Sequence, residues 1–284
     1  MSPRCMLCDG LCRKRFRASG YDVYRCDRCD LERVWPTPSP EAIDAVYQRG
    51  YFTGPGAGYE DYFTREREIA ARKAATRLDR LRDLGVASGR LLDVGCASGY
   101  FLEAAAARGF EVFGVERSDE ARARCVPTLR ERVAPSLDAM TGCFDAITLW
   151  DVLEHLPDPP DTLAALLPRL APRGVLGVVI PVIGSVNTRI APRTWDQYKP
   201  PEHLWFFSPS ALRALLARHG LTVVHEEPAW TRTARFIDPD ARRRDPFTRA
   251  LRGIDALAHA ALAGLLGERV RIDSMAFYAR RSAP

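Results

Sequence analysis

Long apolar runs are scarce in this chain of 284 residues. The longest extends from Gly174 to Val186 and is interrupted by Pro181, and no apolar segment typical of export signals follows Met1. A membrane-spanning helix needs about 20 apolar residues, so we expect neither membrane insertion nor export and predict a cytoplasmic protein. Thiols stay reduced in that compartment, so the eight Cys are expected to be metal ligands or buried thiols.

Lysine is also rare. Only three of the 41 basic residues are Lys, and the basic residues are spread along the chain instead of forming one stripe. The net charge of +5 therefore indicates a compositional bias more than a nucleic-acid surface. Hydrophobic residues make up 46% of the chain and charged residues 27%, which is ordinary for a globular protein. We expect one principal domain with an appendage.

The appendage is predicted over residues 1–35, a polar, Arg-rich segment that holds five of the eight Cys. Four of them form two Cys-x2-Cys pairs separated by 17 residues: Cys5, Cys8, Cys26 and Cys29. This spacing is typical of zinc held by four thiolates, and such a closed shell leaves no position for a catalytic water. The pattern predicts a structural Zn²⁺ in a zinc-ribbon-like module, with rubredoxin-like iron as the alternative, and leaves Cys12 as a spare thiol.

Residues 36–84 are expected to form a helical linker and lid. The stretch "WPTPSP" (35–40) predicts a stiff connector, because each Pro fixes its own φ and restricts the residue before it. A helix is predicted from Pro40, with Ser39 as its N-cap, to about residue 49. A longer helix is predicted over about 59–84, with Gly85 as its stop signal.

From residue 85 to 284, short apolar runs alternate with helical patterns. This alternation predicts an α/β domain with a parallel sheet covered by helices on both faces. Strands are predicted at 90–96, 111–116, 144–150, 174–182, 221–228 and 274–281. Helices are predicted at 99–108, 118–124, 160–170, 208–218 and 247–266.

The stretch "LLDVGCASG" (91–99) carries the strongest signal for a bound cofactor. A buried strand ends at Asp93, a turn containing Gly95 and Gly99 follows, and Glu116 ends the next strand, where it is able to bind both ribose hydroxyls. The spacing differs from Gly-x-Gly-x-x-Gly. A carboxylate at the strand end would repel a pyrophosphate but suits an ammonium group, which favours the amino-acid portion of S-adenosylmethionine over a dinucleotide.

These motifs, together with "GVE" (114–116) and "FDAITLWDVLEHLPDP" (144–159), resemble class I S-adenosylmethionine-dependent methyltransferases over residues 85–284. The resemblance implies a Rossmann-like, seven-stranded, mostly parallel sheet. It also implies S-adenosylmethionine as the methyl donor, with Ala97 where many members have Gly, and an adenine contact near 134–137. The residues that it assigns to the donor are Asp93, Gly95, Ala97, Gly99, Glu116, Trp150 and Asp151.

Two His are candidates for proton transfer or substrate orientation. His203 lies in "PPEHLWFFSP" (200–209), a segment that resembles the one after the fifth strand of small-molecule methyltransferases, and it is the first choice for a base. His155 is expected to be structural or to lie on the cofactor side, with Asp151 and Glu154 as further candidates near strand ends. The aromatic residues between 195 and 207 are expected either to line the substrate site or to pack in the core.

The predicted activity is methyl transfer, most plausibly O-methylation, to a small molecule such as a sugar or a specialised metabolite. The alternative is an RNA or protein methyltransferase in which the basic stretch "RKRFR" (13–17) recognises the substrate, with an aromatic ring able to stack on a base. A donor-binding scaffold without activity is a third hypothesis. The oligomeric state and the acceptor atom stay open.

Overall fold

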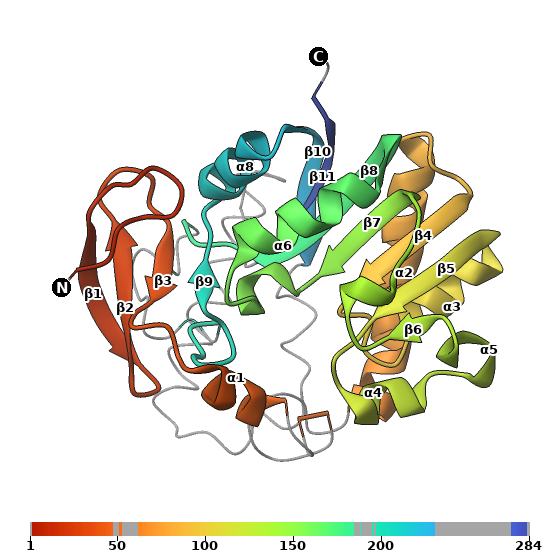
Figure 1. Cartoon of the computed structure of the whole chain (residues 1–284), viewed down its shortest axis with the longest axis horizontal. Helices are drawn as coiled ribbons and strands as arrows, with labels where there is room; N and C mark the ends of the chain where they lie inside the picture. Colours follow the sequence, from red (N-terminus) through yellow and green to blue (C-terminus); the bar gives the residue numbers. More distant parts are fainter. Residues whose placement is uncertain are drawn as a thin grey trace, which may run out of the picture.

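The computed structural model describes residues 2–47, 51–52, 62–184, 188, 195, 197–230 and 274–282. These residues form a large sheet flanked by helices and a small sheet beside it (Figure 1). The helix predicted at 247–266 and the "ARRRD" stretch at 241–245 lie outside the described residues.

The large sheet has seven strands in the order β10-β11-β8-β7-β4-β5-β6. Neighbouring strands are parallel from β8 to β6, whereas β11 is antiparallel to both of its neighbours. The strands are β4 (Gly89–Val94), β5 (Phe110–Val115), β6 (Val133–Ala134), β7 (Phe144–Trp150), β8 (Leu170–Pro181), β10 (Leu221–Trp230) and β11 (Ser274–Arg281). The prediction of a Rossmann-like, seven-stranded, mostly parallel sheet is confirmed, although β6 is too short to show a period in the sequence.

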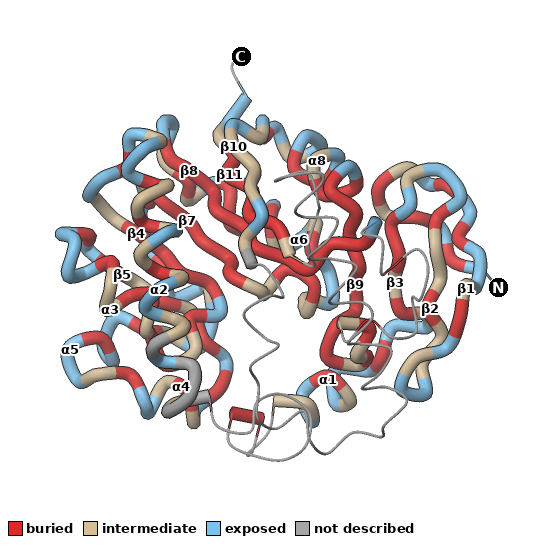
Figure 2. Tube along the Cα trace, turned by 180° about the vertical axis from the view of Figure 1, so that it is seen from behind, coloured by how far each residue is buried: buried red, intermediate tan, exposed pale blue. Residues whose placement is uncertain are grey.

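Helices cover both faces of this sheet because successive side chains of each strand point to opposite sides. In β4, Leu92 packs in the hydrophobic cluster that includes α6 and α8, whereas Leu91 packs in the cluster that includes α2 and α3. The central strands β4, β7 and β8 are accordingly buried along most of their length, whereas the edge strand β10 is mainly half-buried or exposed (Figure 2). The four helices are α2 (Tyr62–Asp83), α3 (Tyr100–Ala107), α6 (Pro159–Leu166) and α8 (Pro209–Arg218).

Helix ends follow the capping signals in the sequence. The Ser39 hydroxyl accepts a hydrogen bond from the Ala42 N–H at the start of α1 (Pro40–Val46), and the Ser208 hydroxyl accepts one from the Ala211 N–H at the start of α8. The remaining helical elements are short: α4 (Asp119–Arg124), α5 (Pro127–Arg130), and the 3₁₀ turns η1 (Leu137–Ala139), η2 (Leu153–His155) and η3 (Leu167–Arg169).

The small sheet joins two distant parts of the chain. Its antiparallel strands are β1 (Cys12–Ala18), β2 (Tyr21–Cys26), β3 (Glu32–Val34) and β9 (Trp205–Phe206), in that order. Strand β9 comes from the segment between β8 and α8, and it pairs with β3 alongside the N-terminal module (Figure 1). The N-terminal module, residues 1–35, is therefore joined to the rest of the protein by strand pairing.

Among the described residues, no helix combines the length and the apolar character needed to cross a membrane.

Candidate functional site

A cavity of about 340 Å³ lies at the carboxyl ends of β4, β5 and β7. This edge is where ligands bind in open α/β sheets. The segment that follows α1 and the helix α2 contribute to its walls. The lining residues are Tyr47, Tyr51, Phe52, Ala70, Lys73, Arg77, Asp93–Ala97, Tyr100, Phe101, Val115–Arg117, Pro135, Trp150–Val152 and His155–Pro157.

The turn after β4 lines the cavity. Every second residue of this turn has a positive φ angle, in the left-handed region of backbone conformations. The φ angles are +74° at Gly95, +47° at Ala97 and +79° at Gly99. A Cβ atom at residue 95 would lie 2.5 Å from a methyl carbon of Val152, so glycine is needed there for space as well as for φ. At residue 97 the chain places an L side chain where glycine is favoured, which stores strain in the turn.

Asp93 lies at the end of β4 with its side chain 3% exposed. The Thr148 hydroxyl on the neighbouring strand β7 donates a hydrogen bond of 2.6 Å to the carboxylate. Burial raises the pKa of Asp93 to about 7, opposed by the Thr148 hydrogen bond and the charge of Arg77. A bound ammonium group would favour the ionised carboxylate, so the environment suits the predicted role opposite the amino-acid end of the donor.

Glu116 directly follows β5 and is held by backbone donors on both oxygens. The Ala97 N–H donates to one oxygen at 3.0 Å and the Ser118 N–H to the other at 2.8 Å. Burial nevertheless raises its pKa. Each carboxylate oxygen keeps a lone pair for a further donor, which is what the predicted role toward the ribose hydroxyls requires.

Trp150 and Asp151 lie at the end of β7, and both line the cavity. Asp151 has φ +57°, which turns the chain sharply after the strand. The guanidinium of Arg77, from α2, lies 4.5 Å from the Trp150 ring centroid and 3.7 Å from the Asp151 carboxylate. The sequence reasoning did not single out Arg77, because a basic residue in a long helix has no local signature of a binding role.

Aromatic residues from the lid were also missed. Tyr51 and Phe52 are buried, line the cavity and pack edge to face with ring centroids 5.0 Å apart. The Tyr51 hydroxyl donates to the Glu202 carboxylate at 2.9 Å, and the Tyr47 hydroxyl lies 2.8 Å from Nδ1 of His155. The only available signal was the Tyr and Phe content of 47–52, which does not distinguish a lid from a core.

The two predicted catalytic His lie together but in different positions relative to the cavity. Their rings are edge to face with centroids 4.5 Å apart, and only His155 lines the cavity. His203 is 2% exposed, and this burial is the main reason that its pKa lies well below the usual value. Nδ1 of His155 lies 2.9 Å from the backbone carbonyl of Glu202, and burial lowers the pKa of His155 to about 4. The structure thus gives the first-choice base no access to the cavity among the described residues.

The aromatic residues of 195–207 pack in the core, which was one of the two expectations. Tyr198 contacts Phe16 of β1, Trp195 and Phe206, with ring centroids 4.6–4.9 Å apart. The five aromatic residues are all buried and none lines the cavity: Trp195, Tyr198, Trp205, Phe206 and Phe207. They join the N-terminal module to the sheet instead of forming a substrate wall.

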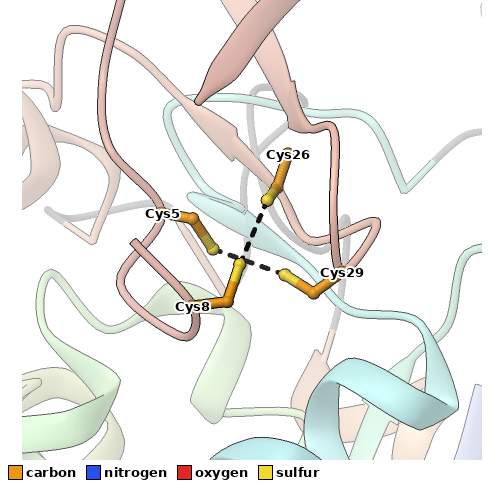
Figure 3. Close-up of side chains that lie close together, drawn as sticks. All are labelled: Cys5, Cys8, Cys26 and Cys29. Atoms are coloured by element: carbon orange, nitrogen blue, oxygen red, sulfur yellow. Dashed lines mark hydrogen bonds between the residues drawn. The ribbon is translucent and has the colours of Figure 1, made fainter. Parts of the chain in front are cut away.

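The four predicted metal ligands converge in the N-terminal module (Figure 3). Their sulfur atoms all lie within 4.8 Å of one another, with 3.4 Å between Cys5 and Cys29 and between Cys8 and Cys26. Zinc–sulfur bonds of about 2.3 Å in a tetrahedron would place sulfurs about 3.8 Å apart. The Leu7 and Arg28 N–H groups also donate to sulfurs, which stabilises thiolates. The donor set therefore fits a zinc ion.

The basic side chains of the "RKRFR" stretch form ion pairs within the N-terminal module, although Arg13, Lys14 and Arg17 stay more than half exposed. Its basic side chains pair with Asp27 (Arg13), Asp22 (Lys14 and Arg17) and Glu32 (Arg15). Arg15 also donates to the Tyr198 hydroxyl at 2.9 Å. Phe16 is 6% exposed within the aromatic cluster around Tyr198. A ring in that position has no face free to stack on a base.

The sheet order, the glycine turn after its first strand and the acidic residue after its second define a Rossmann-like cofactor-binding enzyme. A family model described as "Methyltransferase domain" matches residues 64–226, more than half of the chain. The chain belongs to this family and is an S-adenosylmethionine-dependent methyltransferase.

Solved structures share the fold. An S-adenosylmethionine-dependent methyltransferase from Archaeoglobus fulgidus has 21% identity and a TM-score of 0.55, over 78% of this chain and 99% of that one. Magnesium protoporphyrin IX methyltransferase from Synechocystis PCC 6803, with bound S-adenosylhomocysteine, has 15% identity and a TM-score of 0.51, over 84% and 98%. Mitomycin 7-O-methyltransferase has 14% identity and a TM-score of 0.51, over 77% and 55%. A search of curated protein sequences gives no significant match.

Proposed function

We propose that this methyltransferase acts on a small molecule, by O-methylation, inside the cavity at the carboxyl edge of the sheet. The observation that carries the proposal is the cover over the donor site: Tyr47, Tyr51 and Phe52 wall the cavity. The burial of Phe16 leaves the "RKRFR" stretch without an aromatic ring to stack on a base, which argues against RNA as the substrate.

The donor-binding roles follow the geometry described above. Asp93 would face the donor's ammonium group and Glu116 its ribose hydroxyls. The backbone of Gly95 and Ala97 would contact the donor, while Gly99 shapes the turn and is not among the lining residues. S-adenosylmethionine supplies an electrophilic methyl group when bound. Holding the acceptor oxygen in line with that methyl group would provide much of the rate acceleration.

Asp151 is our choice for the group that takes the acceptor's proton. Its carboxylate lines the cavity at the end of β7, and its side chain is 40% exposed. His203 does not line the cavity, and burial lowers the pKa of His155 to about 4, which makes it a weak base. As the acceptor oxygen bonds to the methyl carbon, the sulfur keeps the electron pair of the broken bond and the hydroxyl proton passes to Asp151.

The test measures S-adenosylhomocysteine production from pools of hydroxylated metabolites, from total RNA and from protein. Turnover with a metabolite pool only is expected. Asp151→Asn should lower kcat by about 100-fold or more with donor affinity retained, whereas the matched Asp138→Asn, at an exposed residue of η1, should not. Turnover with RNA alone, or an Asp151→Asn enzyme at the wild-type rate, would contradict the proposal.

We further propose that Cys5, Cys8, Cys26 and Cys29 hold one structural zinc ion. Cys26→Ser should lose that ion and destabilise the protein, because a small module draws folding free energy from its metal. Cys12→Ser is the matched control, since Cys12 is buried in the same module but is not one of the four clustered sulfurs. Elemental analysis distinguishes zinc from iron, and full metal retention in Cys26→Ser would refute the ligand assignment.

A further inference from the structure

A second group of potential metal ligands lies behind the cavity wall. Glu154, His155 and His203 each offer one ligand atom, and these three atoms lie within 4.8 Å of one another. The elements that supply them are η2, after β7, and the segment that precedes β9. This set is separate from the four cysteines and has no part in the proposed donor site, apart from the contact of His155 with the cavity.

The hydrogen bonds fix which imidazole nitrogens are free. Nδ1 of His155 lies 2.9 Å from the Glu202 carbonyl oxygen, which only accepts, and 2.8 Å from the Tyr47 hydroxyl, which both donates and accepts. The tautomer that satisfies both contacts has the proton on Nδ1 and the lone pair on Nε2. The His203 ring donates to the backbone carbonyl of Gln197, while its Nδ1 has no partner. Nδ1 of His203 is therefore also a lone-pair nitrogen.

Glu154 adds two buried carboxyl oxygens to this set. The residue is 1% exposed, and neither carboxylate oxygen has a hydrogen-bond partner. Its nearest oxygen lies 3.8 Å from Nε2 of His155, too far for a hydrogen bond. Buried polar groups without a partner are costly, and three such atoms lie in this one cluster: both carboxyl oxygens of Glu154 and Nδ1 of His203.

A cation between these three side chains removes the conflict. Metal–nitrogen and metal–oxygen bonds of about 2.0–2.1 Å at tetrahedral angles place ligand atoms about 3.3 Å apart, close to the observed 3.8 Å. Each imidazole already donates its other N–H to a backbone carbonyl, the outer-shell arrangement that orients metal-binding His. We propose that Glu154, His155 and His203 bind a divalent first-row transition ion, with zinc as the probe.

This site would hold His155 in the cavity wall as a metal ligand and not as a base. The Tyr47 hydroxyl also lies 2.8 Å from Nδ1 of this ring, so the ion would help to fix this cavity-lining residue at the end of α1. The assignment does not depend on the acceptor or on the proposed role of Asp151. If no ion binds at Glu154, His155 and His203, the proposed acceptor class and the proposed role of Asp151 are still tested by their own experiments.

The experiment counts metal in the full-length protein after chelation, reloading with Zn²⁺ and removal of excess ion. Wild type should bind two equivalents, and the nearly isosteric Glu154→Gln should bind one. Glu202→Gln is the matched control, because this neighbouring carboxylate is bonded to Tyr51 and Lys199 and lies outside the three-residue set, so it should bind two. His203→Asn provides a second variant and should also bind one.

Melting curves and S-adenosylhomocysteine binding show which variants are folded. Cobalt loading locates the remaining ion, since Glu154→Gln should keep the sulfur-to-cobalt absorption of the cysteine site and lose the contribution of nitrogen and oxygen ligands. One equivalent in wild type, confined to the cysteine site, would overturn the proposal. Two equivalents in a folded Glu154→Gln protein would do the same.

Discussion

Asp93 should couple donor binding to pH. Its pKa is raised from 3.8 to about 7, mainly by burial at the end of β4. Between pH 3.8 and about pH 7, Asp93 is ionised in the unfolded chain but keeps its proton in the native protein. The native state therefore binds more protons, so the contribution of Asp93 to stability is greatest at low pH and is lost as pH rises toward 7.

The size of the effect follows from the shift. About three pKa units correspond to about 4 kcal/mol of free energy of unfolding between the fully protonated and fully ionised limits. A donor ammonium would favour the ionised carboxylate, so binding below about pH 7 requires loss of a proton. S-adenosylhomocysteine carries the same amino-acid portion, and we expect its affinity to fall about tenfold per pH unit below about pH 7.

The assay is titration calorimetry with S-adenosylhomocysteine at several pH values, repeated in buffers of different ionisation enthalpy to count released protons. Asp93→Asn isolates this residue from the other buried acids near the cavity, because the amide is neutral at every pH used. The Asp93→Asn variant should bind S-adenosylhomocysteine more weakly than wild type at high pH, and its affinity should change less with pH. An equal slope in wild type and Asp93→Asn would refute the reasoning.

Two further substitutions test the packing and the turn. Ala97→Gly should raise the free energy of unfolding by about 0.5–1 kcal/mol, because relief of the +47° φ strain exceeds the entropy cost of glycine; a lower value in urea unfolding would contradict this. Phe16→Ala should lower it by about 3–5 kcal/mol by opening a cavity between β1 and Tyr198. Leu11→Ala, at a residue 41% exposed, is the control for Phe16→Ala and should hardly change the free energy of unfolding. An equal loss of this free energy in both variants would refute the packing argument.

Local signals in the sequence were sufficient for much of the fold. The caps Ser39 and Ser208, six strands of the large sheet and the turn at 95–99 depend on neighbouring residues or on a short period. The strand order places residues from three strand ends at one edge. That is why Asp93 and Glu116, 23 positions apart in sequence, line one cavity as expected.

Contacts between distant segments were the part that the sequence did not show. His203 and the aromatic residues of 195–207 carry the same residue types as a substrate site, and only tertiary packing against Phe16 and His155 places them inside the protein. The walls supplied by Tyr51 and Arg77 were missed for the same reason. Their positions depend on how α2 and the segment after α1 lie across the sheet edge.

The strand pairing of β3 with β9 has a consequence for shortening the chain. Removing residues 1–35 would expose the backbone edge of Trp205–Phe206 together with the apolar side chains that now face the module. An unpaired edge next to apolar surface is a template for association between chains. A minimal catalytic fragment would therefore have to keep the whole N-terminal module, with all four clustered cysteines, even though the family match begins only at residue 64.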